Sequence, residues 1–368
     1  MGGCFSNKET YQITNDETST VGDLKCNHEE ADTRLLAHGA WSKKKELVFV
    51  SLDTDVLAIL LLNNEYFSEK QLVIESGDPR GRLDLSKLMI EMTNDGDTEL
   101  TRVRNTGVST PFIFGVIHTL IGTDILCSPR GFGPACIIKT CLDFATLLFD
   151  EKSGLQNAKD EESSRGAYIR YILALFKKKY SSKIKKRSEE ILAPTTQFQE
   201  IVTEIQRETW VHTLESKSML PSEECLNLRE KNWRFQMKIW LQATKPQISV
   251  PDPEDCGWEK TDSGFVLQAD SNDNIKKQKT IFDTIMRKCS CKSSKCITNR
   301  CGCKKNGSLC SSLCECINCE NTGHTQRNPT QSTEGNDDCL DSDEDILTSD
   351  DDTDTDDDGD GESGGEES

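Results

Sequence analysis

Nine of the 17 cysteines in this 368-residue chain lie between residues 289 and 321. They are Cys289, Cys291, Cys296, Cys301, Cys303, Cys310, Cys314, Cys316 and Cys319. An odd number of thiols leaves one unpaired, and the C-x-C steps are difficult to join as disulfides within so short a loop. Three zinc ions need about twelve bonds, which nine thiolates supply if three of them bridge two ions. The pattern therefore favours a zinc cluster over disulfides.

The compartment that the sequence implies agrees with this chemistry. The first residues, MGGCFSNKET, contain no apolar stretch behind basic residues and do not form a signal peptide. The longest apolar run, residues 56–62, is too short to cross a bilayer. We therefore expect a soluble intracellular protein without a membrane partner, in which the thiols stay reduced.

The spacing C-x-C-x4-C-x4-C-x-C-x6-C-x3-C-x-C-x2-C, with its closing CINCEN, resembles the tesmin-type CXC domain. The resemblance implies that all nine cysteines hold a cluster of three zinc ions and that the unit binds DNA. The family often carries tyrosines that reach into the minor groove at the positions that are Arg300 and Leu309 here. We expect Arg300 to enter that groove and Leu309 to pack internally. The family commonly has two such units, and this single unit implies weak or assisted binding.

Basic residues alternate with these cysteines. The candidate DNA-binding cations are Lys292, Lys295, Arg300, Lys304 and Lys305, with Arg287 and Lys288 just before the cluster. Nine thiolates and three zinc ions carry a charge of about −3, which these cations reverse locally. The result is a phosphate-binding surface. The alternative is that the lysines only neutralise the cluster.

The front of the chain carries a second group of residues that could do chemistry. These are Glu30 and Asp32 in EEADTR, Asp53 and Asp55 in SLDTDVL, and Asp124 in LIGTDIL. SLDTDVL follows a predicted parallel strand, where open α/β sheets place active sites. Convergent carboxylates there could hold two Mg²⁺ or Mn²⁺ ions and hydrolyse a phosphodiester. Each motif taken alone is also explained as a helix cap or a helix-dipole partner.

In their order, EAD, DTD, GTD and GFGP resemble the PIN-like and flap-endonuclease core. The resemblance implies divalent-metal ligands at the five carboxylates and a DNA-backbone clamp at Gly131 and Gly133. GFGP is also an ordinary turn. That superfamily begins with an earlier strand bearing a further metal-binding aspartate. We therefore expect this domain to be incomplete at its N-terminus, and its activity stays open.

The elements that must position these residues follow from the apolar patterns. Residues 46–51 and 71–77 predict buried parallel strands. Helices are expected over 27–41 with Asn27 as N-cap, and over 83–92, 111–122, 167–180 and 226–243. Pro134 suits the first turn of a further helix. The fold class is α/β, with an N-terminally truncated PIN/flap-nuclease-like parallel sheet, a helical segment, a small zinc-cluster domain and a disordered acidic tail.

The expected domains are residues 1–150 (nuclease-like), 151–280 (helical segment and linker), 281–322 (CXC zinc cluster) and 323–368 (acidic tail). Residues 336–368 hold 17 acidic residues and no basic one, which accounts for nearly all of the net charge of −19. Such a tail could bind histones or other basic proteins, or only keep the chain soluble. The basic run 177–187 indicates a nuclear localisation signal, a second DNA contact or a solvated helix end.

Three functions stay open at this point. The first is a nuclear, zinc-dependent DNA-binding or chromatin protein with a nuclease-like scaffold. The second is a Mg²⁺- or Mn²⁺-dependent nuclease that the CXC unit targets. The third is an inactive relict of a mobile element, because the order of segments also resembles a multi-copy animal family of CXC-domain proteins.

Overall fold

The structure is a computed structural model. It describes residues 10–321 except 14–16, 76–80, 95–99, 163, 183, 185, 195–197, 211–219, 269–272, 274–275, 277–279, 281–288, 293–294, 308 and 311–313. The predicted acidic tail and the cations Arg287 and Lys288 lie outside the described residues.

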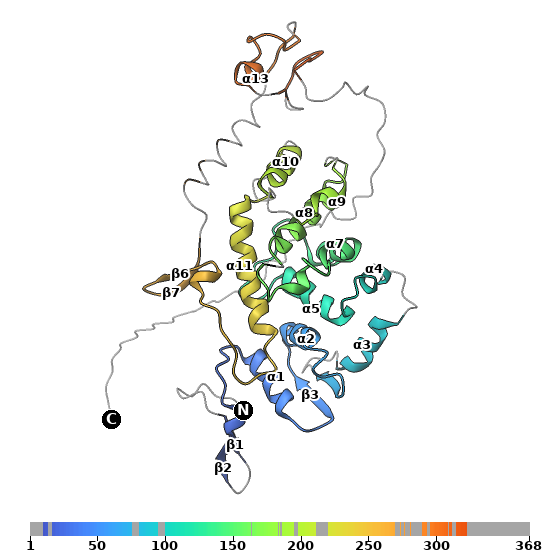
Figure 1. Cartoon of the computed structure of the whole chain (residues 1–368), viewed down its shortest axis with the longest axis vertical. Helices are drawn as coiled ribbons and strands as arrows, with labels where there is room; N and C mark the ends of the chain where they lie inside the picture. Colours follow the sequence, from blue (N-terminus) through green and yellow to red (C-terminus); the bar gives the residue numbers. More distant parts are fainter. Residues whose placement is uncertain are drawn as a thin grey trace, which may run out of the picture.

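Helices and short strands alternate in the front part and helices dominate the rest (Figure 1). The front elements are β1 (Tyr11–Ile13), β2 (Thr18–Thr20), α1 (Ala31–Trp41), β3 (Glu46–Val50), α2 (Thr54–Leu62), β4 (Gln71–Glu75), β5 (Arg82–Asp84), α3 (Leu85–Thr93), α4 (Thr101–Arg104), α5 (Thr110–Ile121), α6 (Pro134–Asp143) and α7 (Ala145–Leu148). The later elements are α8 (Ala167–Lys179), α9 (Ser188–Ile191), α10 (Phe198–Trp210), α11 (Glu223–Trp240), β6 (Trp258–Thr261), β7 (Gly264–Leu267) and α13 (Gly302–Lys305).

The central sheet has three strands in the order β3-β4-β5. β3 and β4 run parallel, with Leu47 opposite Leu72 and Phe49 opposite Ile74. The two predicted strands are therefore present and parallel, but the expectation that both are buried is wrong for β3, whose Val48 and Val50 are exposed on one face. β5 runs antiparallel to β4 and occupies residues expected to begin a helix, so α3 starts only at Leu85. The result is a small mixed sheet, and it does not by itself define a PIN-like fold.

Two strongly apolar helices, α2 and α5, pack against each other beside this sheet. Gly115 permits their close approach, since a Cβ there would lie 2.8 Å from Cγ of Leu62 and 3.0 Å from the Ala58 carbonyl. Asp53 caps α2 through a hydrogen bond from the Asp55 amide to its Oδ1 (2.9 Å). The capping role that the sequence allowed for the DTD motif is therefore present.

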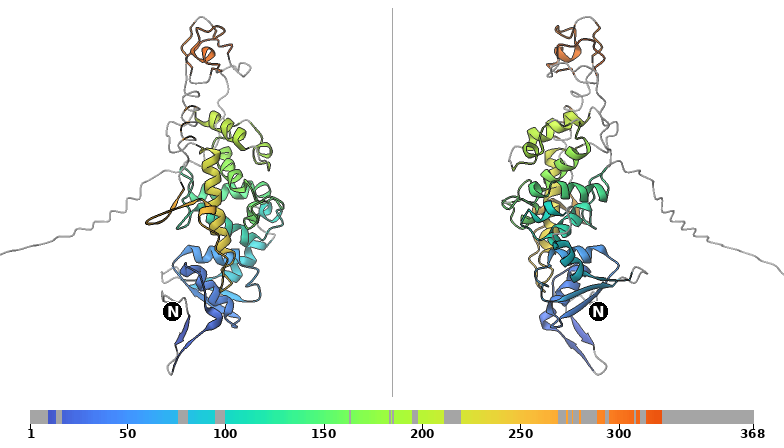
Figure 2. Two further views of the ribbon diagram at one scale, coloured as in Figure 1. Left: turned by 60° about the vertical axis from the view of Figure 1, so that its left-hand side comes forward. Right: turned by 90° about the vertical axis from the view of Figure 1, so that its right-hand side faces the viewer.

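α8 and α11 complete the same core. Trp233 and Trp240 of α11 are fully buried, and the Trp233 indole donates to the Thr119 hydroxyl of α5 (2.9 Å). One cluster of buried side chains runs from Leu36 to Ala243. Residues on both sides of position 150 therefore share a core, and α11 spans the body from its α1 end to α10 (Figures 1 and 2).

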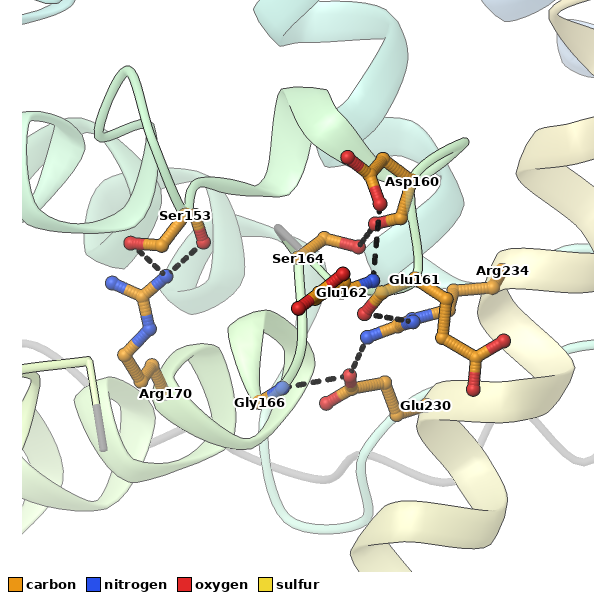
Figure 3. A network of polar contacts seen from close by, with 9 residues as sticks. All are labelled: Ser153, Asp160, Glu161, Glu162, Ser164, Gly166, Arg170, Glu230 and Arg234. Carbon is orange, nitrogen blue, oxygen red and sulfur yellow. Dashed lines mark hydrogen bonds and ion pairs between the residues drawn. The ribbon is translucent and has the colours of Figure 1, made fainter. Parts of the chain in front are cut away.

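A buried ion pair between Glu230 and Arg234 joins α11 to the start of α8 (Figure 3). Gly166 donates its amide to Oε1 of Glu230 (2.8 Å), and Nη1 of Arg234 donates to the Glu161 carbonyl (2.9 Å). Gly166 has a positive φ of 76°, and a Cβ there would clash with the Phe198 ring. Only glycine therefore fits this position.

The start of α1 also differs from the sequence prediction. The N-cap of α1 is Glu30, whereas the Asn27 side chain instead binds the Ile248 backbone, donating to its carbonyl and accepting from its amide (both 2.8 Å). Asn27 thus holds the extended segment after α11 in place. Pro134 lies in the first turn of α6, as predicted. Within the described residues, no helix is both long and apolar enough to span a membrane.

Candidate metal centre

The cysteine-rich segment forms a small core of its own around sulfur. Cys289, Cys296, Cys301, Cys303 and Cys310 are buried, and the other four cysteines pack against them. Backbone hydrogen bonds tie its end to its beginning: Glu315 donates to Cys289 and Ile317 to Cys291 (2.8 and 3.1 Å). With few apolar side chains present, sulfur–metal bonds are the expected source of stability for so small a unit.

The backbone is strained next to two of these cysteines. Lys295, Cys296 and Asn318 have φ values of 47°, 61° and 52°, a region that residues other than glycine seldom adopt. Such conformations persist where the surrounding structure imposes them, often at functional sites. Here the conformations of Lys295 and Cys296 direct the Cys296 side chain into the core, and that of Asn318 lies directly before Cys319.

Distances between the sulfurs fit a metal cluster and exclude disulfides. The Sγ atom of Cys289 lies 3.7 Å from the Sγ atoms of Cys296 and Cys310, and the Sγ atoms of Cys301 and Cys310 are also 3.7 Å apart. A disulfide would need about 2.05 Å. Two sulfurs bound to one tetrahedral zinc at about 2.3 Å lie about 3.8 Å apart. The separations between these cluster sulfurs therefore match the edge of a zinc tetrahedron.

Three groups of four cysteines have all their sulfurs within 4.8 Å of one another. The groups are Cys289, Cys310, Cys314 and Cys316; Cys289, Cys296, Cys301 and Cys310; and Cys296, Cys310, Cys316 and Cys319. Cys310 belongs to all three groups, so its thiolate is placed to bridge. Cys303 joins through a contact of 3.5 Å with Cys314, and Cys291 packs against the same core.

Burial makes these thiols hard to ionise without a cation. It raises the pKa of Cys289, Cys310 and Cys316 to about 12. Burial acts the same way on Cys301, but the backbone amides of Lys304 and Cys303 and the neighbouring thiols outweigh it and lower the pKa of Cys301 to about 6. Cys301 is also the N-cap of α13, where its Sγ accepts from the Lys304 amide (3.5 Å). A metal must displace protons from the other thiols as it binds.

Comparison with known protein families supports this site. The model described as "Tesmin/TSO1-like CXC domain, cysteine-rich domain" matches residues 286–323. Neither curated proteins nor solved structures yield a match to the chain. The chain therefore contains a CXC domain with a dense cysteine cluster that can bind metal, a class of domain that generally binds DNA.

The cations of this segment lie on its surface. Lys292, Arg300, Lys304 and Lys305 are exposed, while Lys295 forms an ion pair with Glu320 (3.1 Å). Leu309 was expected to pack internally, and this expectation is wrong, since the side chain is 61 % exposed. Ile297 and Ile317 are also exposed. The sulfur core is too small to cover these apolar side chains.

The five predicted carboxylates come from separate elements, and the structure brings their charges together. Glu30 and Asp32 lie at the start of α1, Asp53 and Asp55 at the start of α2, and Asp124 after α5. Burial raises the pKa of Asp32, and the charges of Asp53, Asp55, Glu30 and Asp124 raise it further. Among the described residues, however, no three acidic side chains bring their oxygens within 4.8 Å of one another.

Some of these carboxylates already have partners that the sequence did not reveal. Asp55 accepts a hydrogen bond from Nε2 of His118 on α5 (2.7 Å). Glu30 accepts from the Trp240 indole (3.0 Å), which links the EEADTR motif to α11. His28 is buried, and its Nε2 lies 2.6 Å from the Lys245 carbonyl. No local spacing could have indicated these long-range pairs.

The GFGP turn is packed against α8. Gly131 has a φ of 79°, and its carbonyl accepts from Nζ of Lys179 (2.9 Å). The Lys179 ammonium also lies 5.0 Å from the centre of the Phe132 ring, and Phe132 packs on Phe176. Gly133 is the N-cap residue of α6. These contacts explain the turn, and its predicted role as a DNA clamp stays a prediction.

Proposed function

We propose that this chain is a nuclear, zinc-dependent DNA-binding protein whose CXC domain docks on DNA and whose front domain is a nuclease-like scaffold. The observation that carries the proposal is the set of three overlapping four-sulfur groups inside a CXC domain with exposed cations. All nine cysteines act as zinc ligands. Three ions with four ligands each require three bridging thiolates, and Cys310 is the best placed of these.

The exposed cations give this domain its affinity for DNA. Lys292, Lys304 and Lys305 bind phosphates, which makes the affinity depend strongly on salt. Lys295 contributes less, because Glu320 already neutralises it. Arg300 precedes the second C-x-C pair on the surface and enters the minor groove, preferentially where A·T pairs narrow it.

Replacing Arg300 by alanine tests the groove contact. We expect Arg300→Ala to weaken binding to an A·T-rich duplex by about 1–3 kcal/mol and to reduce the preference over a G·C-rich duplex. Lys292→Ala should weaken binding to both duplexes equally. It should also lower the slope of log affinity against log salt concentration by about one, the amount expected for one lost phosphate contact. Fluorescence anisotropy at two salt concentrations measures both effects. Equal losses on both duplexes for the two variants would contradict groove insertion.

The partners beyond DNA belong to the same proposal. The acidic segment 323–368 attracts histones or other basic proteins through its charge. The basic run 177–187 supports nuclear entry, but the described cations in it are engaged: Lys178 pairs with Asp143, Lys186 with Glu204, and Arg187 with Glu190. Nuclear localisation therefore rests mainly on the DNA-binding class.

A second candidate function is Mg²⁺- or Mn²⁺-dependent cleavage of nucleic acid in the front domain. The observation that favours it is that the negative charges of four other carboxylates act on Asp32. Neighbouring carboxylates repel one another, and a divalent cation between them stabilises their ionised forms. Against it stand the partners already bound to Asp55 and Glu30.

The double variant Asp53→Ala, Asp55→Ala decides whether these carboxylates act. If the front domain is a nuclease, the wild-type chain cleaves a branched DNA substrate with Mn²⁺. The cleavage rate of the double variant should then be at least about a hundredfold lower. Glu75→Ala, at the end of β4, is the control and should keep the rate. Cleavage that survives in the double variant would place the metal site elsewhere, and no cleavage by the wild-type chain would support the scaffold role.

A further inference from the structure

β3 exposes an apolar face that a soluble protein normally covers. The side chain of Val48 is 44 % exposed and that of Val50 67 %, while the alternating residues Leu47 and Phe49 are buried in the core. Leu52 and Trp41, on either side of the strand, are also exposed. Strands that pair in parallel are normally buried on both faces, because helices cover each side. Within the part of the chain that the structure describes, nothing covers these side chains.

The same strand also has an unpaired edge. β3 ends the sheet, and no described residue pairs with its outer side. The Lys45 carbonyl accepts from Gln71 (2.7 Å), and the Ser51 amide donates to Glu75 (3.1 Å), so odd-numbered residues bond to β4. Because these directions alternate along a strand, the amides and carbonyls of Glu46, Val48 and Val50 point to the free edge. Such an edge is a template for another strand.

We propose that β3 pairs with β3 of a second copy of this chain, antiparallel about a twofold axis at Val48. A twofold axis at any residue of the strand pairs even-numbered residues with even-numbered ones, whose amides and carbonyls are free. A centre at Val48 keeps all five residues of the strand in register, with Glu46 opposite the partner's Val50. Each copy then meets the same patch on the other, as a twofold interface requires.

Charge selects a second copy over an unrelated strand. Lys43, Lys44 and Lys45 precede β3, and Asp53 and Asp55 follow it. Antiparallel pairing about Val48 places Lys43 opposite the partner's Asp53, at both ends of the pair. Lysines beside an edge ordinarily prevent pairing, but here the partner supplies the matching carboxylates. The dimer also brings two CXC domains into one complex, which raises its avidity for DNA.

Sedimentation velocity on the full chain over a wide concentration range tests the dimer. Val48→Lys places two ammonium groups directly opposite each other and should raise the dimer dissociation constant by at least about tenfold. Leu83→Lys is the matched control, because Leu83 is 40 % exposed on β5, the other edge of the sheet. It should leave association unchanged. Circular dichroism establishes that both variants stay folded.

Crosslinking tests the register independently. Val48→Cys should join two copies rapidly through a short bis-maleimide, since residue 48 faces its own counterpart. In Val50→Cys the two new thiols lie roughly 14 Å apart along the strand and should not react faster than the wild-type chain. A wild-type chain that is monomeric at every concentration overturns the proposal. So does faster crosslinking at position 50 than at 48, or dissociation caused by Leu83→Lys.

Discussion

Replacing Cys310 by serine is expected to remove zinc from the CXC domain and to abolish its DNA binding. Cys310 belongs to all three four-sulfur groups, so its loss disturbs every one of them. Serine is a poor zinc ligand near neutral pH, and structural zinc supplies about 10–16 kcal/mol of folding free energy in small domains. Native mass spectrometry gives the zinc content of the full chain, and anisotropy gives its affinity for duplex DNA.

Two matched variants make this result specific. Cys319 belongs to one of the three groups, so Cys319→Ser should release fewer ions than Cys310→Ser. Cys127 is exposed and lies outside the cluster, so Cys127→Ser should keep both zinc and DNA binding. Full zinc content in Cys310→Ser would contradict the bridging role. Loss of zinc without loss of DNA affinity would separate the cluster from the proposed function.

Replacing Trp233 by alanine is expected to destabilise the whole body of the protein by about 3–5 kcal/mol. The side chain is 0 % exposed, packs on Tyr168 of α8 and donates its indole N–H to Thr119 of α5. It therefore joins the front and helical segments in one core. Urea unfolding followed by both circular dichroism and fluorescence should show one shared transition, shifted to lower urea.

Two other substitutions calibrate this loss. Trp233→Phe keeps most of the ring volume, and the Thr119 hydroxyl can still donate to the Val116 carbonyl (2.7 Å), so we expect a smaller loss of about 1–2 kcal/mol. Trp41→Ala removes a half-exposed ring and should change stability by less than about 0.5 kcal/mol. Two separate transitions in the wild-type chain would show that the front and helical segments unfold independently despite their shared core.

The cysteine cluster was predictable because its chemistry is local. All nine thiols lie within one short stretch, so spacing alone indicated metal over disulfides, and the family match and the sulfur distances agree with it. What spacing could not show was which thiols share an ion. Contacts such as that between Cys289 and Cys310 depend on how the turn at Lys295 and Cys296, which lies between them, folds the segment back on itself.

In the front part, apolar runs predicted the positions of the parallel strands and of most helices, although β3 is buried on one face only. The short strand β5 was not predicted, since three residues are too few to show a strand pattern in front of a helix. The hydrogen-bond partners of the carboxylates were not predicted for another reason. His118 and Trp240 lie 63 and 210 residues from Asp55 and Glu30, and no sequence period connects them.

The sequence by itself determined most of the longer elements, the sulfur chemistry and the grouping of charge along the chain, because these depend on neighbouring residues. The tertiary structure alone decided that the front and helical segments share one core, that the charges of Asp53, Asp55 and Asp124 act on Asp32, and that β3 keeps a free apolar edge. Each of these depends on packing between elements far apart in the chain, where side-chain volume and backbone direction select the contacts.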